Sequence, residues 1–185
     1  MSKNRRIGPA VVILAAGQGK RMKSELPKVV FDLAGWPLIR HVIEAAKPLK
    51  AARMIAVTGH GRKLVEAAIA SAGDGGTGVE TVLQREQKGT GHAVRCAEKA
   101  LKGFDGDVMV LLGDVPNLRP ALLREFLTAH RRRKAAATIL TMIQHDPTGY
   151  GRVLRDERGE ILAIREEKDA SPEERAVTEV NSGIM

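Results

Sequence analysis

The sequence is poor in aromatic residues and in cysteine. Its 185 residues include one Trp, one Tyr and three Phe, so we expect a core of aliphatic side chains and alanine. This scarcity argues against the aromatic stacking platforms on which single-stranded nucleic acids are usually bound. Cys96 is the one cysteine, which excludes an internal disulfide and fits a reducing cytosol. Because Cys96 lies within a helical pattern, we expect a packed or half-exposed thiol rather than a nucleophile.

Long apolar runs are also missing, and none approaches the length needed to cross a bilayer. Residues 10–16 follow three basic residues and so imitate a signal peptide. That run is at the lower length limit for such a segment, and glycines and further cations follow it in place of a cleavage site. We therefore interpret residues 10–16 as a buried strand of a cytoplasmic protein.

The sequence offers no Ser/His/Asp or Cys/His constellation for nucleophilic catalysis. His92 has no evident partner carboxylate, so we interpret it as a histidine at a helix start rather than an acid/base group. The acidic residues between positions 146 and 169 have no metal-ligand spacing, and most are expected to be solvated surface. They are Asp146, Asp156, Glu157, Glu166, Glu167 and Asp169.

Positive charge is in excess, with a net charge of +8 and an isoelectric point near 9.9. Seven of the 30 basic residues precede position 29, against the single acid Glu25. A nucleic-acid-binding protein is one hypothesis for this charge, supported also by the basic cluster at residues 131–134. The cluster falls at the end of a predicted helix, however, where a solvated helix terminus explains it. We therefore expect no nucleic-acid partner.

Strand-like and helix-like segments alternate with short links. This pattern predicts an α/β fold, namely a Rossmann-like, mostly parallel sheet with helices on both faces. After a proline at position 172, Glu173 and Glu174 predict the first turn of a short helix. The predicted strands are residues 11–14, 54–57, 79–83, 108–112 and 136–143, the longer helices are residues 38–46, 64–69, 89–101 and 122–133, and residues 73–78 predict a turn or flexible loop.

Ligands of such sheets bind beyond the carboxyl ends of the strands. The first strand runs into a loop with Gly17 and Gly19, which lets backbone N–H groups approach an anion and can supply a positive φ. Four cations follow the loop, which favours phosphate binding. The spacing matches neither a P-loop nor a dinucleotide fingerprint, since Met22 stands where the third glycine would be. The cations are Lys20, Arg21, Lys23 and Lys28.

Two more strand ends carry polar residues. Asp114 is either a helix cap, a turn former or a ligand for Mg²⁺, which commonly takes one or two carboxylates and fills its shell with phosphate oxygens and water. Beside the glycine loop, the metal role is favoured. Gln84 carries an amide that suits the edge of a uracil ring, although the sequence alone favours a loop glutamine that faces water.

The string L-A-A-G-x-G-x-R-M-x-x-x-x-P-K at residues 14–28 resembles the signature of sugar-1-phosphate nucleotidyltransferases. Six stretches narrow this resemblance to the uridyltransferase half of bacterial bifunctional N-acetylglucosamine-1-phosphate uridyltransferases. The resemblance implies the nucleotide-diphospho-sugar transferase fold, Mg²⁺, and in-line attack of N-acetylglucosamine-1-phosphate on the α-phosphorus of UTP. The stretches are LPKVVFDLAGWPLIRHVIEAA, QREQKGTGHAV, LLGDVPN, DPTGYGRV, IREEKDA and EVNSGIM.

The resemblance also implies roles for single residues. Arg21 and Lys28 would face the phosphates as the catalytic cations, and Asp114 would carry Mg²⁺. Leu112 and Gly113 would reach the ribose together with Asp114. The remaining positions divide between uridine (Leu14, Ala15, Ala16, Gly17, Gln84, Gly89 and Thr90) and the N-acetylglucosamine part (Gly151, Glu166 and Asn181).

The chain departs from the family pattern in two ways. Leu112 stands where the family usually has tyrosine, and the chain stops at Met185, before a further asparagine that completes the family's metal site. We therefore expect residues 1–185 to be a nucleotidyltransferase (pyrophosphorylase) domain that is incomplete at its C-terminus. A left-handed β-helix acetyltransferase domain would be missing, and the full-length parent would be a homotrimer. Two alternatives stay open: a nucleotide-binding module without catalysis, and a related enzyme with another base or sugar.

Overall fold

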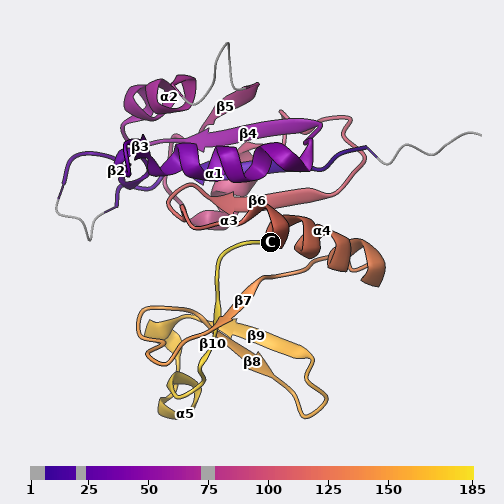
Figure 1. Cartoon of the computed structure of the whole chain (residues 1–185). Helices are drawn as coiled ribbons and strands as arrows, with labels where there is room; N and C mark the ends of the chain where they lie inside the picture. Colours follow the sequence, from indigo (N-terminus) through magenta and orange to yellow (C-terminus); the bar gives the residue numbers. More distant parts are fainter. Residues whose placement is uncertain (1–6, 20–23, 72–77) are drawn as a thin grey trace, which may run out of the picture. The chain divides into compact units, whose positions relative to one another are not determined.

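The chain folds into two compact units, Met1–Arg132 and Arg133–Met185 (Figure 1). The computed structural model describes residues 7–19, 24–71 and 78–185. The predicted loop at residues 73–78 lies outside these ranges except for Gly78. The helices are α1 (Leu38–Ala46), α2 (Arg62–Ala70), α3 (Thr90–Cys96), α4 (Pro120–Arg133) and α5 (Pro172–Arg175), with short 3-10 turns at Lys28–Val30, Lys47–Leu49 and Glu167–Asp169. The strands are β1 (Ala10–Ala15), β2 (Asp32–Leu33), β3 (Trp36–Pro37), β4 (Arg53–Thr58), β5 (Val79–Leu83), β6 (Val108–Leu112), β7 (Thr141–Ile143), β8 (Arg152–Arg155), β9 (Ile161–Arg165) and β10 (Glu179–Asn181).

The first unit is built on a parallel sheet with strand order β5-β4-β1-β6. All three neighbouring pairs run parallel, with Ala15 opposite Thr58 and Leu14 opposite Leu112. Strand β1 is central and its first four residues are fully buried, as expected of a continuous apolar run covered on both faces. The prediction of an α/β fold with a parallel sheet is confirmed, and the carboxyl ends of β1 and β6 lie at the same edge.

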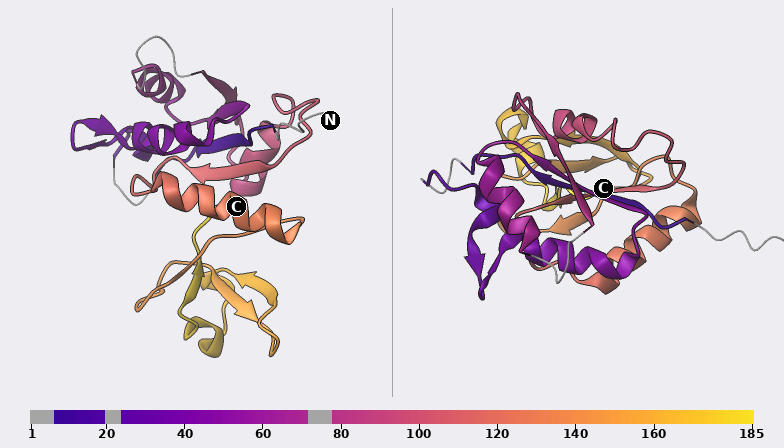
Figure 2. Two further views of the ribbon diagram at one scale, coloured as in Figure 1. Left: turned by 45° about the vertical axis from the view of Figure 1, so that its right-hand side comes forward. Right: turned by 90° about the horizontal axis from the view of Figure 1, so that it is seen from above.

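Helices cover both faces of this sheet (Figure 2). On one face, Ala93 and Ala97 pack against Val12, Ile55 and Val57. Since side chains alternate along a strand, the fully buried neighbours of Val12 point to the other face, where α1 contacts β1. The fully buried residues of α1 are Ile39, Val42, Ile43 and Ala46.

The second unit contains a mostly antiparallel sheet with strand order β7-β10-β8-β9. The prediction of one strand over residues 136–143 is wrong, because β7 has only three residues and pairs with β10 outside the parallel sheet. The reason lies in its partner. Leu140 donates to the carbonyl of Ile184 and accepts from the N–H of Ser182, and that partner segment is irregular.

Helix α3 ends at Cys96, five residues before its predicted end at residue 101. From Ala97 onward the chain continues in tighter turns, with i→i+3 bonds such as Leu101 to Glu98. The guanidinium of Arg53 donates to the carbonyls of Ala100 (2.6 Å) and Lys102 (3.1 Å), so side-chain bonds replace the missing helical ones. The Cys96 thiol is half-buried against the core, as predicted.

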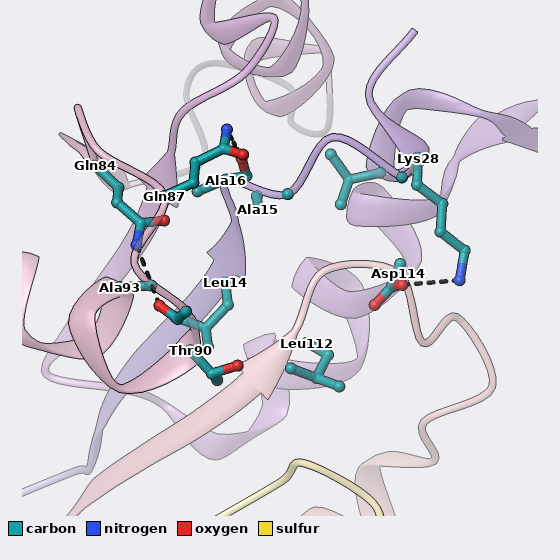
Figure 3. A pocket seen from close by; sticks show the side chains of 14 residues that line it. Leu14, Ala15, Ala16, Lys28, Gln84, Gln87, Thr90, Ala93, Leu112 and Asp114 are labelled. Atoms are coloured by element: carbon teal, nitrogen blue, oxygen red, sulfur yellow. Dashed lines mark hydrogen bonds and ion pairs between the residues drawn. The ribbon is translucent and has the colours of Figure 1, made fainter. Parts of the chain in front are cut away.

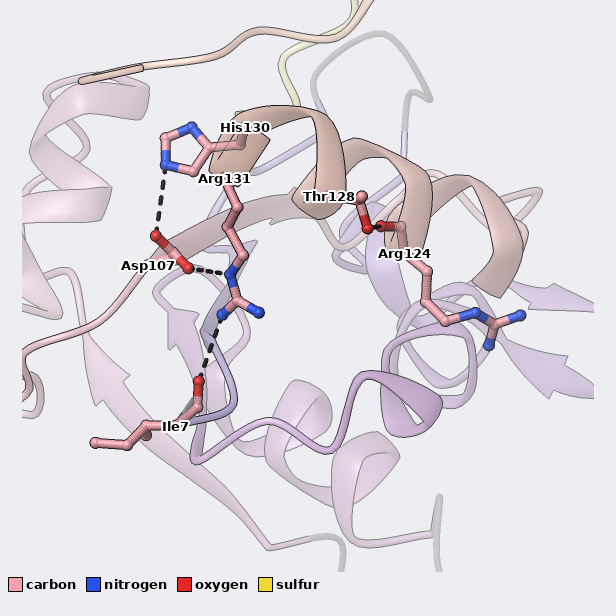
Figure 4. A network of polar contacts seen from close by, with 6 residues as sticks. All are labelled: Ile7, Asp107, Arg124, Thr128, His130 and Arg131. Atoms are coloured by element: carbon pink, nitrogen blue, oxygen red, sulfur yellow. Dashed lines mark hydrogen bonds and ion pairs between the residues drawn. The ribbon is translucent and has the colours of Figure 1, made fainter. Parts of the chain in front are cut away.

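The basic cluster at the end of α4 is partly structural (Figure 4). Nε of Arg131 lies 2.6 Å from Oδ2 of Asp107, and its guanidinium also donates to the carbonyl of Ile7 at 3.4 Å. Nε2 of His130 lies 3.5 Å from the other carboxylate oxygen of Asp107. The interpretation of the whole cluster as a solvated terminus is therefore wrong for Arg131, which ties α4 to the residues just before β1 and β6.

The short helix predicted around Glu173 is confirmed as α5. The hydroxyl of Ser171 accepts from the N–H of Glu174, and the Glu174 carboxylate accepts from the N–H of Ser171, which forms a capping box. In the described parts of the chain, no helix combines the length and the apolar character that a membrane span requires.

Candidate active site

A cleft of about 350 Å³ opens at the carboxyl edge of the parallel sheet in the first unit (Figure 3). The loops that follow β1, β5 and β6 and the first turn of α3 line it. As far as the structure describes it, the lining holds no Ser, Cys or His, so it contains no Ser–His or Cys–His pair for nucleophilic catalysis. The lining residues are Leu14, Ala15, Ala16, Gly17, Gly19, Lys28, Val29, Gln84, Gln87, Gly89, Thr90, Ala93, Leu112 and Asp114.

Hydrogen bonds hold the loop after β1 in place. The carbonyl of Ala16 accepts from Nε2 of Gln87 (2.9 Å) and from the N–H of His60 (3.2 Å). The carbonyl of Leu14 accepts from the N–H of Gly113 at 2.9 Å, which joins this loop to the end of β6. The contact of Gln87 with the glycine loop was not predicted from the sequence.

The two loop glycines differ in what they require. Gly19 has a φ of +62°, and a Cβ there would lie 3.0 Å from the Cβ of Lys28. The positive φ expected of the loop therefore belongs to Gly19. A Cβ on Gly17 would meet nothing within 4 Å, because that residue faces the open cleft. Gly113, expected beside the ribose, is buried under the loop, where a Cβ would lie 3.0 Å from the carbonyl oxygen of Leu14.

A lysine and an aspartate from distant parts of the chain form an ion pair in the cleft. Nζ of Lys28 lies 2.8 Å from Oδ2 of Asp114. Asp114 follows β6 in a turn, and α4 begins only at Pro120, so the helix-cap interpretation of Asp114 is wrong. Nowhere in residues 7–19, 24–71 and 78–185 do three His, Cys, Asp or Glu side chains gather as they would around a metal ion. A cation here would therefore depend on Asp114 and on oxygens from a ligand.

Gln84 is buried, with only 4% of its surface exposed, so the interpretation as a water-facing glutamine is wrong. Its backbone N–H donates to the carbonyl of Thr58 at the end of β4. Its amide nitrogen donates to the carbonyl of Gly89 at 3.2 Å and lies 3.0 Å from Nδ1 of His92. Figure 3 shows the amide oxygen turned away from the bond to Gly89. The loop between β5 and α3 thus folds back onto the side chain at its own start.

Except for Gly113, the first-unit positions expected to bind uridine and ribose line this cleft. Leu112, which replaces the family tyrosine, lines it from the end of β6, and Thr90 lines it from the start of α3. Gly89, with a φ of +90°, allows the sharp entry into α3. Arg21 lies outside the described residues.

The three positions expected to hold the sugar lie close together within the second unit. The N–H of Asn181 donates to the carbonyl of Gly151 at 2.8 Å, and a Cβ on Gly151 would lie 3.2 Å from Oε1 of Glu166. The buried guanidinium of Arg152 supports this region, since its NH2 lies 2.7 Å from Oε2 of Glu167. Hydrogen bonding to Arg152 lowers the pKa of Glu167 below its ordinary value.

Comparison with protein families finds a match of residues 11–178 to the MobA-like NTP transferase domain. The chain is 50% identical over 177 residues to a protein from Corynebacterium efficiens named bifunctional protein GlmU, covering 95% of this chain and 36% of that relative. A protein of the same name from Pelobacter propionicus is 51% identical over 175 residues, covering 95% of this chain and 37% of the relative. The chain thus spans little more than a third of the length of the curated relatives that it matches.

Two solved structures share the fold. A UDP-glucose pyrophosphorylase complexed with UDP-glucose superposes with a TM-score of 0.75 at 20% identity, covering 95% of this chain and 74% of its own. A CMP:2-keto-3-deoxy-manno-octonic acid synthetase complexed with CTP gives a TM-score of 0.65 at 24% identity, covering 95% and 72%. The likeness extends over nearly the whole described chain and concerns the fold alone.

Proposed function

Because this chain belongs to the family of MobA-like NTP transferase domains, we propose that it transfers the uridylyl group of UTP to N-acetylglucosamine-1-phosphate. The products are UDP-N-acetylglucosamine and pyrophosphate. The observation that carries this proposal is a sequence identity of 50% and 51%, over 95% of the chain, to two proteins named bifunctional protein GlmU. The cleft at the carboxyl edge of the parallel sheet supports it, because that edge is where such folds bind their ligands.

In the proposed reaction, an oxygen of the sugar phosphate attacks the α-phosphorus of UTP in line and pyrophosphate leaves. Such a transfer depends on positioning and charge neutralisation and needs no protein nucleophile, which agrees with the composition of the cleft lining. Lys28 would act as a point charge beside the α-phosphate, and Arg21 would fork onto the leaving pyrophosphate. The buried amide of Gln84 would hydrogen-bond the base.

We also propose that Mg²⁺ is the metal of this reaction. When bound, it would neutralise charge on the phosphate oxygens. Asp114 fits the ion, because it presents a partly exposed carboxylate in the cleft, where Lys28 is its ion-pair partner in the part of the chain that the structure describes. On nucleotide binding, Lys28 would be free to move from Asp114 to the phosphates, so the ion pair would keep both side chains in the cleft before the substrate arrives.

The sugar moiety would be held by Gly151, Glu166 and Asn181. Their grouping within the second unit supports this assignment, as does their match to the sugar-binding positions of the uridyltransferase family. We further propose that both units belong to one pyrophosphorylase domain. In the longer relatives, this domain would be joined to a trimer-forming acetyltransferase domain that serves cell-envelope precursor synthesis.

The decisive experiment incubates the 185-residue chain with UTP, Mg²⁺ and N-acetylglucosamine-1-phosphate and follows pyrophosphate release. A panel with CTP, dTTP and glucose-1-phosphate tests base and sugar preference. We expect release above background with UTP and N-acetylglucosamine-1-phosphate, and much less with the other pairs. UTP binding in a calorimeter without any release would instead favour a nucleotide-binding module, and release that prefers dTTP or CTP would reassign the base.

A further inference from the structure

We infer that His92 is a positioning residue that orients the Gln84 amide and thereby makes the cleft prefer uracil-like bases over cytosine. This inference rests on the proposed function, since it concerns the same nucleotide site. His92 is not among the residues that line the cleft as the structure describes it, whereas Gln84 is. Any effect of His92 on the base must therefore pass through another side chain, and its contact with Gln84 supplies that route.

The hydrogen bonds around Gln84 assign the two ends of its amide. A backbone carbonyl can only accept, so the amide atom 3.2 Å from the oxygen of Gly89 must be the nitrogen. The same nitrogen lies 3.0 Å from Nδ1 of His92. Because an amide nitrogen has two hydrogens and no lone pair to offer, Nδ1 must accept the second one. His92 is therefore neutral in this arrangement, with its proton on Nε2.

Both hydrogens of the amide are thus used inside the protein, and the oxygen is the part left for a ligand. Oε1 of Gln84 has no partner among the residues that the structure describes, and Figure 3 shows it on the side away from the bond to Gly89. A uracil or thymine ring offers an N3–H donor that suits this acceptor. A cytosine ring presents a lone pair at N3, so the two acceptors would repel each other.

The hydrogen bond to Gly89 alone favours this orientation of the Gln84 amide only weakly, and the contact with His92 strengthens the preference. If the amide rotated by half a turn, its oxygen would face the Gly89 carbonyl and, as long as the His92 proton stays on Nε2, the lone pair of Nδ1, which are two unfavourable contacts. Without the imidazole, one of these contacts disappears, and the native orientation leaves a buried N–H group without an acceptor. The rotated amide, which presents N–H groups to the base, then becomes more populated and favours cytosine.

The test compares two substitutions of similar size at position 92. His92→Leu removes the acceptor, whereas His92→Asn keeps a δ oxygen where Nδ1 stands. Calorimetry of UTP and CTP binding to the 185-residue chain measures base preference for the natural protein and both variants. We expect the natural chain to prefer UTP, His92→Leu to reduce the UTP-over-CTP ratio by about tenfold, and His92→Asn to restore most of it.

A double-mutant cycle shows whether the effect passes through Gln84. Gln84→Ala should reduce the same ratio, and adding His92→Leu to it should change the ratio no further. A histidine that acted only on folding would lower both affinities together and leave the ratio unchanged. Nitrogen NMR of the unsubstituted chain gives a second measurement, independent of how the variants fold, with Nδ1 of His92 expected unprotonated and Nε2 protonated.

The inference is overturned if His92→Leu folds and keeps the natural UTP-over-CTP ratio, or if NMR finds the proton of His92 on Nδ1. Failure of the proposed function looks different. A natural chain that binds UTP and prefers it, but forms no product with N-acetylglucosamine-1-phosphate, contradicts the proposed reaction and leaves the role of His92 intact. A natural chain that binds neither nucleotide, or binds them equally well, overturns both.

Discussion

The two glycines of the loop after β1 have opposite requirements. Gly19 has a left-handed backbone and a close neighbour, whereas Gly17 has neither. We expect Gly19→Ala to lower the free energy of unfolding by about 1–2 kcal/mol, because an alanine at a φ of +62° is strained and its Cβ presses on Lys28. Gly17→Ala is the matched control and should leave stability nearly unchanged while weakening UTP binding. Urea unfolding and calorimetry measure the two effects, and equal losses of stability would contradict this account of the loop.

The ion pair between Lys28 and Asp114 is partly exposed. Its loss should therefore change stability little, even where it changes activity strongly. Side chains in such pairs contribute about 0–1 kcal/mol to stability, so Asp114→Asn should hardly change thermal unfolding. Pyrophosphate release should fall by on the order of 100-fold or more, because the proposed metal ligand is lost. Glu44→Gln, which breaks a similar surface pair with Lys47, is the control and should keep full activity. Activity that survived in Asp114→Asn would remove this carboxylate from the mechanism.

At the residue scale, the sequence predicted which residues lie in the cleft better than it predicted their hydrogen-bond and ion-pair partners. The glycine loop, Gln84 and Asp114 could be named because each lies within the first few residues after a predicted strand. The burial of Gln84 could not be predicted, since it arises when the start of α3 folds back over the end of β5. The pairing of Lys28 with Asp114 depends on the order of strands, which local patterns do not encode.

Among the secondary-structure elements, the turns that follow α3 depend on a side chain from β4. Arg53 donates to the carbonyls of Ala100 and Lys102, and its guanidinium carbon lies 5.7 Å from the centre of the Phe104 ring. We expect Arg53→Met to lower the free energy of unfolding by about 1.5–3 kcal/mol, because these charged hydrogen bonds vanish while the stem keeps much of its packing. Lys63→Met, at an exposed position of α2, should have little effect. Chemical denaturation of both variants measures the difference, and equal stabilities would show that water replaces Arg53 at little cost.

The sheet of the second unit should be sensitive to acid. Hydrogen bonding to Arg155 lowers the pKa of Glu179 below its ordinary value of 4.5, and Arg152 does the same for Glu167. A lowered folded-state pKa means that the stabilisation is complete above about pH 4.5 and is lost as the pH falls through the lowered value. Circular dichroism between about pH 2 and pH 6 should therefore show acid destabilisation that becomes shallower in Glu179→Gln.

Arg155→Gln is the complementary variant in this test. It removes the partner that lowers the Glu179 pKa, so it should shift the acid transition in the same direction as Glu179→Gln. If both variants lost stability with the same acid dependence as the natural chain, the pair would contribute nothing to the pH profile.

Predictability also differed between the two sheets. The four parallel strands were recognised because each is a run rich in β-branched or aliphatic residues that a turn and a helix follow. Strand β7 was misjudged because its partner, β10, comes much later in the chain and its own run is only three residues long. The hairpin of β2 and β3 was not predicted at all, since each of its strands has only two residues.

For the molecule as a whole, the excess positive charge raises the question of nonspecific nucleic-acid binding. Arg131 is held by Asp107, and the chain has few aromatic residues on which bases could stack, so we expect no retention of random single-stranded DNA at physiological ionic strength. UTP binding should weaken as salt rises, because in the proposed reaction the phosphates bind to Lys28 and Arg21, whose positive charges salt screens. Fluorescence polarisation with labelled DNA and calorimetry at several salt concentrations measure both effects. DNA binding that persisted at about 0.15 M salt would revive the nucleic-acid hypothesis.

The division into two compact units was not predictable from the sequence. The change from alternating strands and helices to short antiparallel strands occurs without a proline- or glycine-rich linker. Residues 134–140, which read KAAATIL, lead from α4 to β7. The family resemblance nevertheless assigned the uridine positions to the first unit and the sugar positions to the second. Whether these two sets serve one substrate pair is what the proposed assay measures.

The carbonyl oxygen of Ala16 accepts two hydrogen bonds, one from Gln87 and one from the N–H of His60. In a planar trans peptide, the N–H group of the next residue points the opposite way. The dipole of the Ala16–Gly17 peptide is therefore aligned before any nucleotide enters. A ligand oxygen that accepts a hydrogen bond from the N–H of Gly17 would meet a donor that is already oriented. Such a fixed dipole stabilises negative charge without the reorientation that water molecules would require.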